Sequence, residues 1–179
     1  MALGGYLLDQ ATKAWALVAL AERDVEVIGD FFTLNLVFNP GAAFGIGTQY
    51  TIVFTGLLMV AAVAVLYFSR RMADSLWALG LGALLAGVLG NLTDRVLREP
   101  EPFRGHVIDF LSFGNFPVFN VADVCINVAA GVIILQSLRG VSLDGTRHDD
   151  ADADLAHDNT GAGPSGDARP LASGEDTPR

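Results

Sequence analysis

The chain has 179 residues, of which 51% are hydrophobic and only 17% are charged, below the ~25% charged residues of an average soluble domain. Its mean hydropathy is +0.42. This composition excludes an intrinsically disordered protein and a collagen-like chain. Cys125 is the single cysteine, which excludes an internal disulfide and a cysteine-rich metal site.

The net charge of −9 is concentrated at the C-terminal end of the chain. Residues 140–179 hold nine acidic residues and three arginines, a net charge of −6, and their composition shows no apolar periodicity. We therefore expect a disordered acidic tail over 140–179 and a single domain over 1–139. The absence of a basic patch argues against a nucleic-acid partner.

Four apolar segments have the length of a membrane-spanning helix, which needs ~20 mainly apolar residues. They lie at 1–20, 51–69, 74–92 and 120–138. The sequence thus predicts an all-α membrane protein with four transmembrane helices. Arg70 and Arg71 lie in the short turn between the second and third segments, and short loops rich in arginine stay in the cytoplasm. Both termini are then cytoplasmic, and the loops 21–50 and 93–119 lie outside.

The first segment is interrupted by polar residues, namely Asp9, Gln10, Thr12 and Lys13. A cleaved secretory signal peptide is one interpretation, but such peptides carry positive charge before their apolar core and not inside it. The pattern favours a membrane helix from which part of the start is missing. Asp9 and Lys13 are four residues apart, so they share one helix face and are expected to form an ion pair.

Other local patterns indicate close packing and a small sheet. Gly82, Ala86 and Gly90 recur at intervals of four, a spacing that lets helices approach closely, although flexible glycines are an equally good interpretation. In the outer loop, 25–28 and 31–38 are rich in β-branched and aromatic residues and are separated by a Gly-Asp turn. We expect them to form a small extracytoplasmic β-sheet on the outer membrane surface.

Ionisable residues within membrane segments are costly and therefore indicate functional sites. Asp109 and Asp123 stand at the outer end of the bundle, with Gly114 and Pro117 between them, so a single helix cannot hold both. Two carboxylates at one depth share a proton near neutral pH and can activate a water molecule. The alternative is structural: Asp123 caps the fourth helix and Asp109 pairs with an arginine. Asn120, Asp123 and Asn127 lie on one helix stripe that faces the bundle.

The sequence lacks the motifs that other classes of hydrolase require. The sequence has no His-Glu-x-x-His motif and no Gly-x-Ser-x-Gly turn. A metal site that uses His106 with Asp109 and Cys125 is conceivable, but a lone interfacial histidine and an apolar packed cysteine are the simpler interpretation.

Five motifs in order resemble those of bacterial lipoprotein signal peptidase, also called signal peptidase II. They are Leu8-Asp-Gln-Ala-Thr-Lys13, Asn39-Pro-Gly-Ala-Ala-Phe-Gly45, Gly90-Asn-Leu-Thr-Asp-Arg95, Gly105-His-Val-Ile-Asp-Phe110 and Phe119-Asn-Val-Ala-Asp123. The resemblance covers residues 8–138, and the short link between the two aspartates is similar to that of actinobacterial members.

The resemblance implies an intramembrane aspartyl endopeptidase of the bacterial cell membrane, with Asp109 and Asp123 as the catalytic pair. It implies site-supporting or substrate-binding roles for Asp9, Lys13, Asn39, Asn91, Arg95 and Asn120. Such enzymes cut prolipoproteins just before a cysteine that carries diacylglycerol, among membrane lipids. They use no metal and no cofactor, and globomycin-type cyclic peptides inhibit them.

Two other classes of function remain open at this point. A proton-coupled transporter or channel would use the intramembrane carboxylates and Arg95 as a relay through the full depth of the bilayer. A non-catalytic membrane scaffold would use the acidic tail for docking. The second apolar segment carries no charge, and most charged residues gather toward one side of the membrane, which favours the peptidase.

Overall fold

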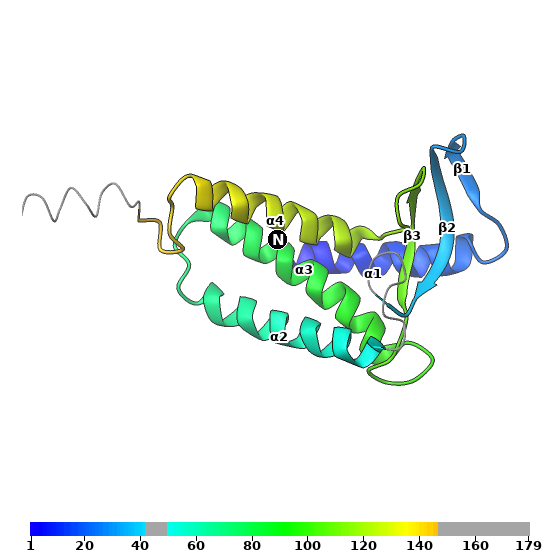
Figure 1. The fold of residues 1–179 in the computed structure, drawn as a ribbon, viewed down its shortest axis with the longest axis horizontal. Coiled ribbons are helices and arrows are strands. Elements are labelled where there is room, and N and C mark those ends of the chain that lie inside the picture. Colours follow the sequence, from blue (N-terminus) through cyan, green and yellow to red (C-terminus); the bar gives the residue numbers. More distant parts are fainter. Residues whose placement is uncertain (42–49, 147–179) are drawn as a thin grey trace, which may run out of the picture.

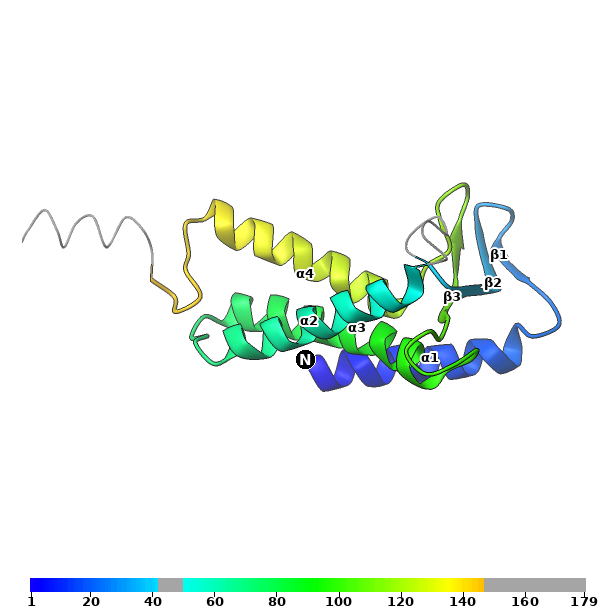
Figure 2. The ribbon, with the colours of Figure 1, turned by 60° about the horizontal axis from the view of Figure 1, so that its bottom comes forward.

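The computed structural model describes residues 1–41 and 50–146. Its elements are α1 (Ala2–Ala19), β1 (Val25–Ile28), β2 (Phe32–Asn39), α2 (Thr51–Ser69), α3 (Ser75–Leu97), β3 (Val107–Phe113) and α4 (Val121–Leu138). The helices lie side by side, and the sheet stands across one end of them (Figures 1 and 2). Most of the described chain is therefore a helical bundle, and the sheet lies at one end of it.

Three helices in the described part of the chain, α2, α3 and α4, are long and apolar enough to cross a membrane. The 18-residue α1 is not among them, because polar residues interrupt its apolar sequence. The expected third span, 74–92, proves too short: α3 continues to Leu97. Its last turn holds Asp94 and Arg95 on the helix, whereas the sequence analysis began an outer loop at residue 93.

Helix α1 packs against α3 through small residues. A methyl group on Gly90 would collide with the Asp9 carboxylate of α1, and one on Gly82 would press against Met1. Ala86, between these two glycines, lies against Gly5. The residue pairs advance together along both helices, so α1 and α3 run in the same direction. The spacing of Gly82, Ala86 and Gly90 therefore marks a helix–helix contact rather than local flexibility.

The sheet has three antiparallel strands in the order β1-β2-β3. The two expected strands and the turn between them are confirmed, and Gly29 in that turn has φ +46°, a conformation that favours glycine. The sequence analysis missed β3, whose residues 107–113 it left in a loop. Phe110 of this strand packs with Ala16 and Leu20 of the α1 end, so the sheet is fixed to the bundle.

The opposite end of the bundle is closed by residues that the sequence analysis assigned to the tail. The carbonyl of Val141 accepts a hydrogen bond from the Trp77 indole at 3.0 Å, and the carbonyl of Leu143 accepts one from the Ala73 N–H at 3.0 Å. Residues 140–146 thus pack beside the start of α3. The rest of the expected tail, 147–179, lies outside the described residues, as does 42–49 in the outer loop.

Candidate active site

Asp109 is placed by the register of the sheet. It pairs with Val37 of the neighbouring strand, and Asn39 lies two residues further along that strand, on the same face of the sheet. The Asn39 side chain therefore reaches Asp109, and its Nδ2 donates to Asp109 Oδ2 at 2.9 Å. Asn39 Oδ1 in turn accepts a hydrogen bond from the Gly41 N–H at 3.0 Å, which fixes the orientation of the amide.

The segment after β3 turns back and brings the start of α4 beside Asp109. The N–H of Leu111 donates to the Phe119 carbonyl at 2.8 Å, and the Phe119 N–H donates to the Leu111 carbonyl at 3.0 Å. The turn contains Gly114, with φ +51°. The next residue, Asn120, is fully buried, and its Nδ2 donates to Asp109 Oδ1 at 2.7 Å. Both oxygens of Asp109 thus accept an amide N–H.

Asp123 belongs to a reciprocal cap at the N-terminus of α4. The Asn120 Oδ1 accepts from the Asp123 N–H at 3.0 Å, and Asp123 Oδ2 accepts from the Asn120 N–H at 3.1 Å. The capping interpretation of Asp123 is therefore confirmed, and such a cap stabilises a helix start by ~1 kcal/mol. The other half of that alternative is wrong within the described residues, because Asp109 is hydrogen-bonded by asparagines and not by an arginine.

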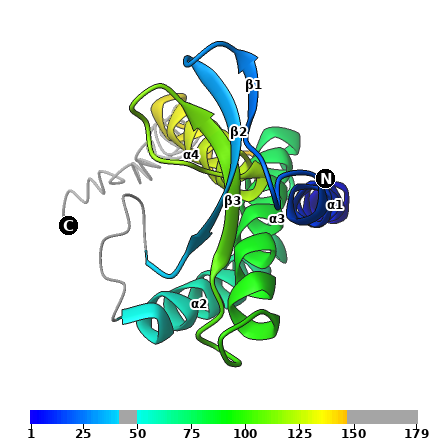
Figure 3. The same cartoon turned by 90° about the vertical axis from the view of Figure 1, so that its right-hand side faces the viewer.

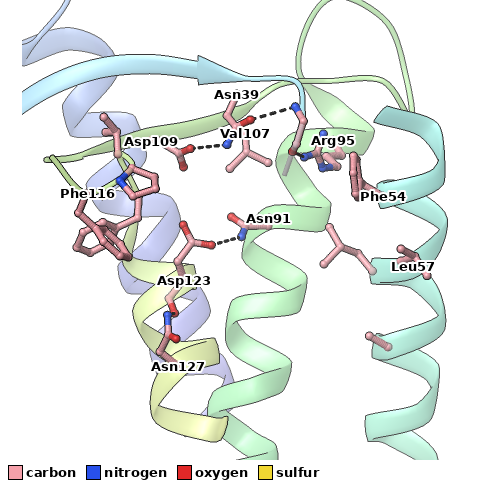
Figure 4. Close-up of a pocket in the computed structure, with 16 residues that line it drawn as sticks. Asn39, Phe54, Leu57, Asn91, Arg95, Val107, Asp109, Phe116, Asp123 and Asn127 are labelled. Atoms are coloured by element: carbon pink, nitrogen blue, oxygen red, sulfur yellow. Dashed lines mark hydrogen bonds between the residues drawn. The ribbon is translucent and has the colours of Figure 1, made fainter. Parts of the chain in front are cut away.

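Asn91 of α3 joins the two carboxylates to the rest of the bundle. Its Nδ2 donates to Asp123 Oδ1 at 2.9 Å, and its Oδ1 accepts from Asn120 Nδ2 at 3.1 Å. The same Oδ1 accepts from Lys13 Nζ at 3.0 Å. A cation on Oδ1 fixes which end of the amide faces the carboxylate. Figure 4 shows Asn91 pointing from α3 toward Asp123.

A buried ion cluster lies behind Asn91. Lys13 Nζ is 2.9 Å from Asp9 Oδ2 and 2.8 Å from Asp94 Oδ2, and all three side chains are fully buried. The expected Asp9–Lys13 pair is confirmed, whereas Asp94 was missed as a partner. Asp94 also contacts Arg98 Nε and accepts from the Ile108 N–H at 3.3 Å. The sequence signal that could have indicated Asp94 as a partner is its position three residues after Asn91, within a polar motif.

Arg95 joins backbone segments around the pocket. Its guanidinium donates to the carbonyl oxygens of Pro40, Gly41 and Gly105. It also lies over the Phe54 ring, 5.8 Å from the ring centre. The planar group thus holds the end of β2, the loop before β3 and the start of α2 together, a geometry for which arginine is suited and lysine is not.

These side chains surround one pocket of about 650 Å³ (Figure 4). Its polar residues are Asn39, Asn91, Arg95, Asp109, Asp123 and Asn127. The α2 wall is apolar, with Phe54, Leu57, Leu58 and Ala61, and the turn before α4 adds Phe116 and Phe119. Lys13 and Asn120 do not line the pocket but bind residues that do. Asp9 lies one step further away and binds Lys13. The helix stripe expected to face the bundle therefore supplies Asp123 and Asn127 to the pocket and Asn120 to the buried cap.

The charge state of Asp109 follows from its surroundings. Burial raises the pKa of Asp109 to about 7. The hydrogen bond from Asn39 lowers this pKa, the nearby Asp123 carboxylate raises it, and the Asn120 hydrogen bond and the Lys13 charge lower it. A carboxyl group with this pKa exchanges its proton readily near neutral pH, as acid–base catalysis requires.

The structure does not assemble the metal site that His106 suggested. His106 lies in a separate pocket beside Arg98 and Leu17, and Cys125 packs near Gly5 of α1. Within residues 1–41 and 50–146, no three histidine, cysteine or acidic side chains are grouped to hold a metal ion.

Comparison with known proteins decides the family. The family model described as "Signal peptidase (SPase) II" matches residues 1–139. The chain belongs to the signal peptidase II family. The lipoprotein signal peptidase of Mycobacterium leprae is 44% identical over 150 residues, covering 83% of this chain and 75% of that protein. The lipoprotein signal peptidase of Streptomyces coelicolor is 41% identical over 151 residues, covering 84% and 74%.

A solved structure resembles the fold as well. It is described as a bacterial membrane enzyme determined at 2.3 Å by the in meso method, and it is 30% identical, with a TM-score of 0.67. The match covers 76% of this chain and 84% of that one. The resemblance stated from the five motifs is therefore confirmed, and this signal peptidase II chain is a membrane protein.

Proposed function

We propose that this chain removes signal peptides from prolipoproteins as an aspartic endopeptidase, with Asp109 and Asp123 as the catalytic pair. Membership of the signal peptidase II family supports the reaction. The observation that carries the catalytic type is the convergence of two carboxylates, one from β3 and one from α4, on one pocket through a shared Asn120. A transporter has no support, because α2 carries no charged residue.

The proposed chemistry uses the two carboxyl groups in opposite protonation states. In this scheme Asp109 is assigned the proton and Asp123 the negative charge; burial raises the pKa of Asp109 to about 7, so its carboxyl group can hold a proton near neutral pH. Asp123 takes a proton from a water molecule, and the water oxygen attacks the scissile carbonyl carbon while Asp109 donates its hydrogen bond to the carbonyl oxygen. The intermediate then breaks its C–N bond as a proton passes to the leaving nitrogen. A new carboxyl and a new amine result.

The walls of the pocket suit a substrate that is anchored in lipid. The scissile bond lies next to a cysteine that carries diacylglycerol, so it stays near the membrane surface. The apolar α2 wall, with Leu57, Leu58 and Ala61, offers a path on which acyl chains and signal peptide remain out of water. Globomycin-type cyclic peptides are expected to occupy the same pocket and inhibit cleavage.

We further propose that α1 is a fourth membrane-spanning helix and that residues 1–139 form the peptidase domain of the bacterial inner membrane. In support, α1 packs along α3, and its Lys13 is neutralised by two buried carboxylates. Arg70 and Arg71 follow α2 and favour a cytoplasmic turn. The sheet and pocket then face outward, and both termini are cytoplasmic, with 140–179 as an acidic tail.

This orientation is tested by labelling single cysteines in intact cells, in a Cys125→Ser background. A cysteine at Asp30, in the turn between β1 and β2, is expected to react with a membrane-impermeant reagent. A cysteine at Ser142, beyond α4, is expected to react only after lysis. Labelling at Ser142 in intact cells would contradict the proposed topology.

The function itself is tested with the purified full chain in detergent and a synthetic prolipoprotein peptide. Cleavage just before a diacylglyceryl-cysteine, with the unlipidated peptide cut at least about tenfold more slowly, is the expected result. Asp109→Asn is expected to leave the peptide intact, and added chelator to have no effect. Cleavage that survives in Asp109→Asn would overturn the aspartic mechanism.

A further inference from the structure

Asn127 differs from the other asparagines in and around the pocket in what its side chain binds. In Asn39, Asn91 and Asn120, the Oδ1 and Nδ2 atoms both form hydrogen bonds within the chain. Asn127 Nδ2 donates to the Asp123 carbonyl at 2.9 Å, and no donor in the part of the chain that the structure describes reaches its Oδ1. One acceptor of the pocket is thus left for a ligand.

The surroundings make this free acceptor unusual. Asn127 is exposed and lies on α4, a helix apolar enough to span a membrane. An amide at this depth is costly unless it is hydrogen-bonded. It lines the same pocket as Asp109 and Asp123, and Figure 4 places it below Asp123, on the side away from the sheet. Across the pocket stand Leu57 and Ala61 of α2, which cannot bind its amide.

The chemistry of the free atom selects the class of ligand. An Oδ1 acceptor needs a hydrogen-bond donor. The diacylglyceryl group offers ester oxygens, which only accept hydrogen bonds, and acyl chains offer neither donors nor acceptors. A peptide backbone in extended form offers N–H groups, and at this depth each of them must find a partner. Residues of both α2 and α4 line the pocket, and the two helices lie apart in the end-on view of Figure 3. An extended segment in this pocket can therefore reach the amide.

We propose that Asn127 binds a backbone N–H of the signal peptide, about two residues before the scissile bond; this rests on the proposed function. Asn127 follows Asp123 by four residues, about 6 Å along a helix, and an extended chain advances about 3.3 Å per residue. The signal peptide runs from the scissile bond into the membrane, whereas the mature protein leaves outward. Asn127 therefore determines how the peptide part of the substrate is held, separately from its lipid.

The test compares the wild-type chain with Asn127→Leu and Asn127→Ala on a lipidated prolipoprotein peptide. Both variants are expected to raise KM about threefold to tenfold, with kcat changed by less than about twofold, because a hydrogen bond present throughout the reaction is lost. Val128→Leu is the matched control: Val128 is exposed on the same helix but does not line the pocket, so its KM stays at the wild-type value. A KM increase in Asn127→Leu but not in Asn127→Ala would indicate steric obstruction and overturn the proposal.

The position of the contact is tested with peptide analogues. In each, one backbone N–H among the four residues before the cut is replaced by an ester oxygen. One analogue, at about the second residue, is expected to raise the wild-type KM about threefold to tenfold and to leave the KM of Asn127→Leu unchanged. Equal effects of every analogue on both proteins would overturn the proposal. That failure is distinct from failure of the proposed function, in which Asp109→Asn would still cleave.

Discussion

Asn120 and Asp109 lie side by side, with 2.7 Å between the asparagine Nδ2 and the aspartate Oδ1. The backbone N–H of Asn120 also donates to Asp123 Oδ2 at 3.1 Å. The residue that caps the N-terminus of α4 therefore sets the position of the strand carboxylate relative to the helix carboxylate. The proposed catalytic pair comes from two different elements and needs such a link, because sheet and helix would otherwise move independently.

The first prediction concerns the two carboxylates as a unit. Asp109→Asn and Asp123→Asn are each expected to lower kcat by at least about a hundredfold, because an amide neither accepts a proton from water nor donates the acidic one. The double variant is expected to lose little more than either single variant. Steady-state cleavage of a lipidated peptide measures all three.

Asp30→Asn is the control for this comparison, because Asp30 is exposed in the turn between β1 and β2. It is expected to cleave at the wild-type rate. Losses that multiply in the double variant would show that the two carboxylates act independently.

The second prediction concerns pH and stability. The pKa of Asp109 is raised to about 7 in the folded chain, from an unfolded value near 4. The folded state holds a proton there that the unfolded state releases, so this contribution to stability is present below about pH 4 and is lost as pH rises through about 7. Asp109→Asn removes the effect. Its Tm relative to the wild type is expected to rise between pH 5 and pH 8.

Thermal unfolding in detergent at several pH values measures this difference. A constant difference in Tm across the range would show that Asp109 does not titrate there. Cleavage activity is expected to follow the same titration. The kcat should decline above about pH 7 as Asp109 loses its proton, since the protonated form of Asp109 is the proposed acid.

The third prediction separates Arg95 from the chemical step. Arg95→Lys keeps the charge, but its three donors sit on one nitrogen and cannot span the carbonyls that Nη1 and Nη2 of the guanidinium reach, so we expect a destabilisation of about 2 kcal/mol. Protein level and Tm are expected to fall together with activity. Arg104→Lys is the control, because that arginine pairs on the surface with Glu101. A stable Arg95→Lys protein without turnover would place Arg95 among the catalytic groups.

The fourth prediction concerns the ion cluster. Lys13→Met leaves Asp9 buried without its cation and Asp94 with Arg98 alone, and breaking a buried pair in this way costs about 3–5 kcal/mol. The variant is expected to accumulate poorly and to unfold at a lower temperature. Adding Asp9→Asn removes the uncompensated charge and is expected to recover part of the lost stability. A Tm unchanged by Lys13→Met would refute a stabilising role for the cluster.

Much of this arrangement could be predicted from local pattern. The apolar runs gave α2 and α4 close to their observed bounds, and β-branched and aromatic residues gave β1 and β2. The strand β3 was not predicted, because it carries an aspartate in a mainly apolar segment. Yet Val107-Ile-Asp-Phe-Leu-Ser-Phe113 has the composition of a strand.

The contacts of the site were harder to predict, because they join residues far apart in the sequence. Lys13 and Asn91 are 78 positions apart and Asn39 and Asp109 are 70 apart, so no local periodicity indicates either pair. The role of Asp94 also depends on burial, which a polar motif at a helix end does not reveal. By contrast, Asp9 and Lys13 are one helical turn apart, and their pairing followed from spacing alone.

The ion cluster also constrains the order in which the chain assembles. Synthesis delivers Asp9 and Lys13 before Asp94, which completes the cluster and emerges about eighty residues later. Until α3 is inserted, Asp9 and Lys13 lack Asp94 as a partner, and α1 lacks the small-residue face of α3 to pack on. Charged side chains that face lipid are costly in this state. Helix α1 is thus synthesised before α3 but reaches its final position only when α3 has been inserted.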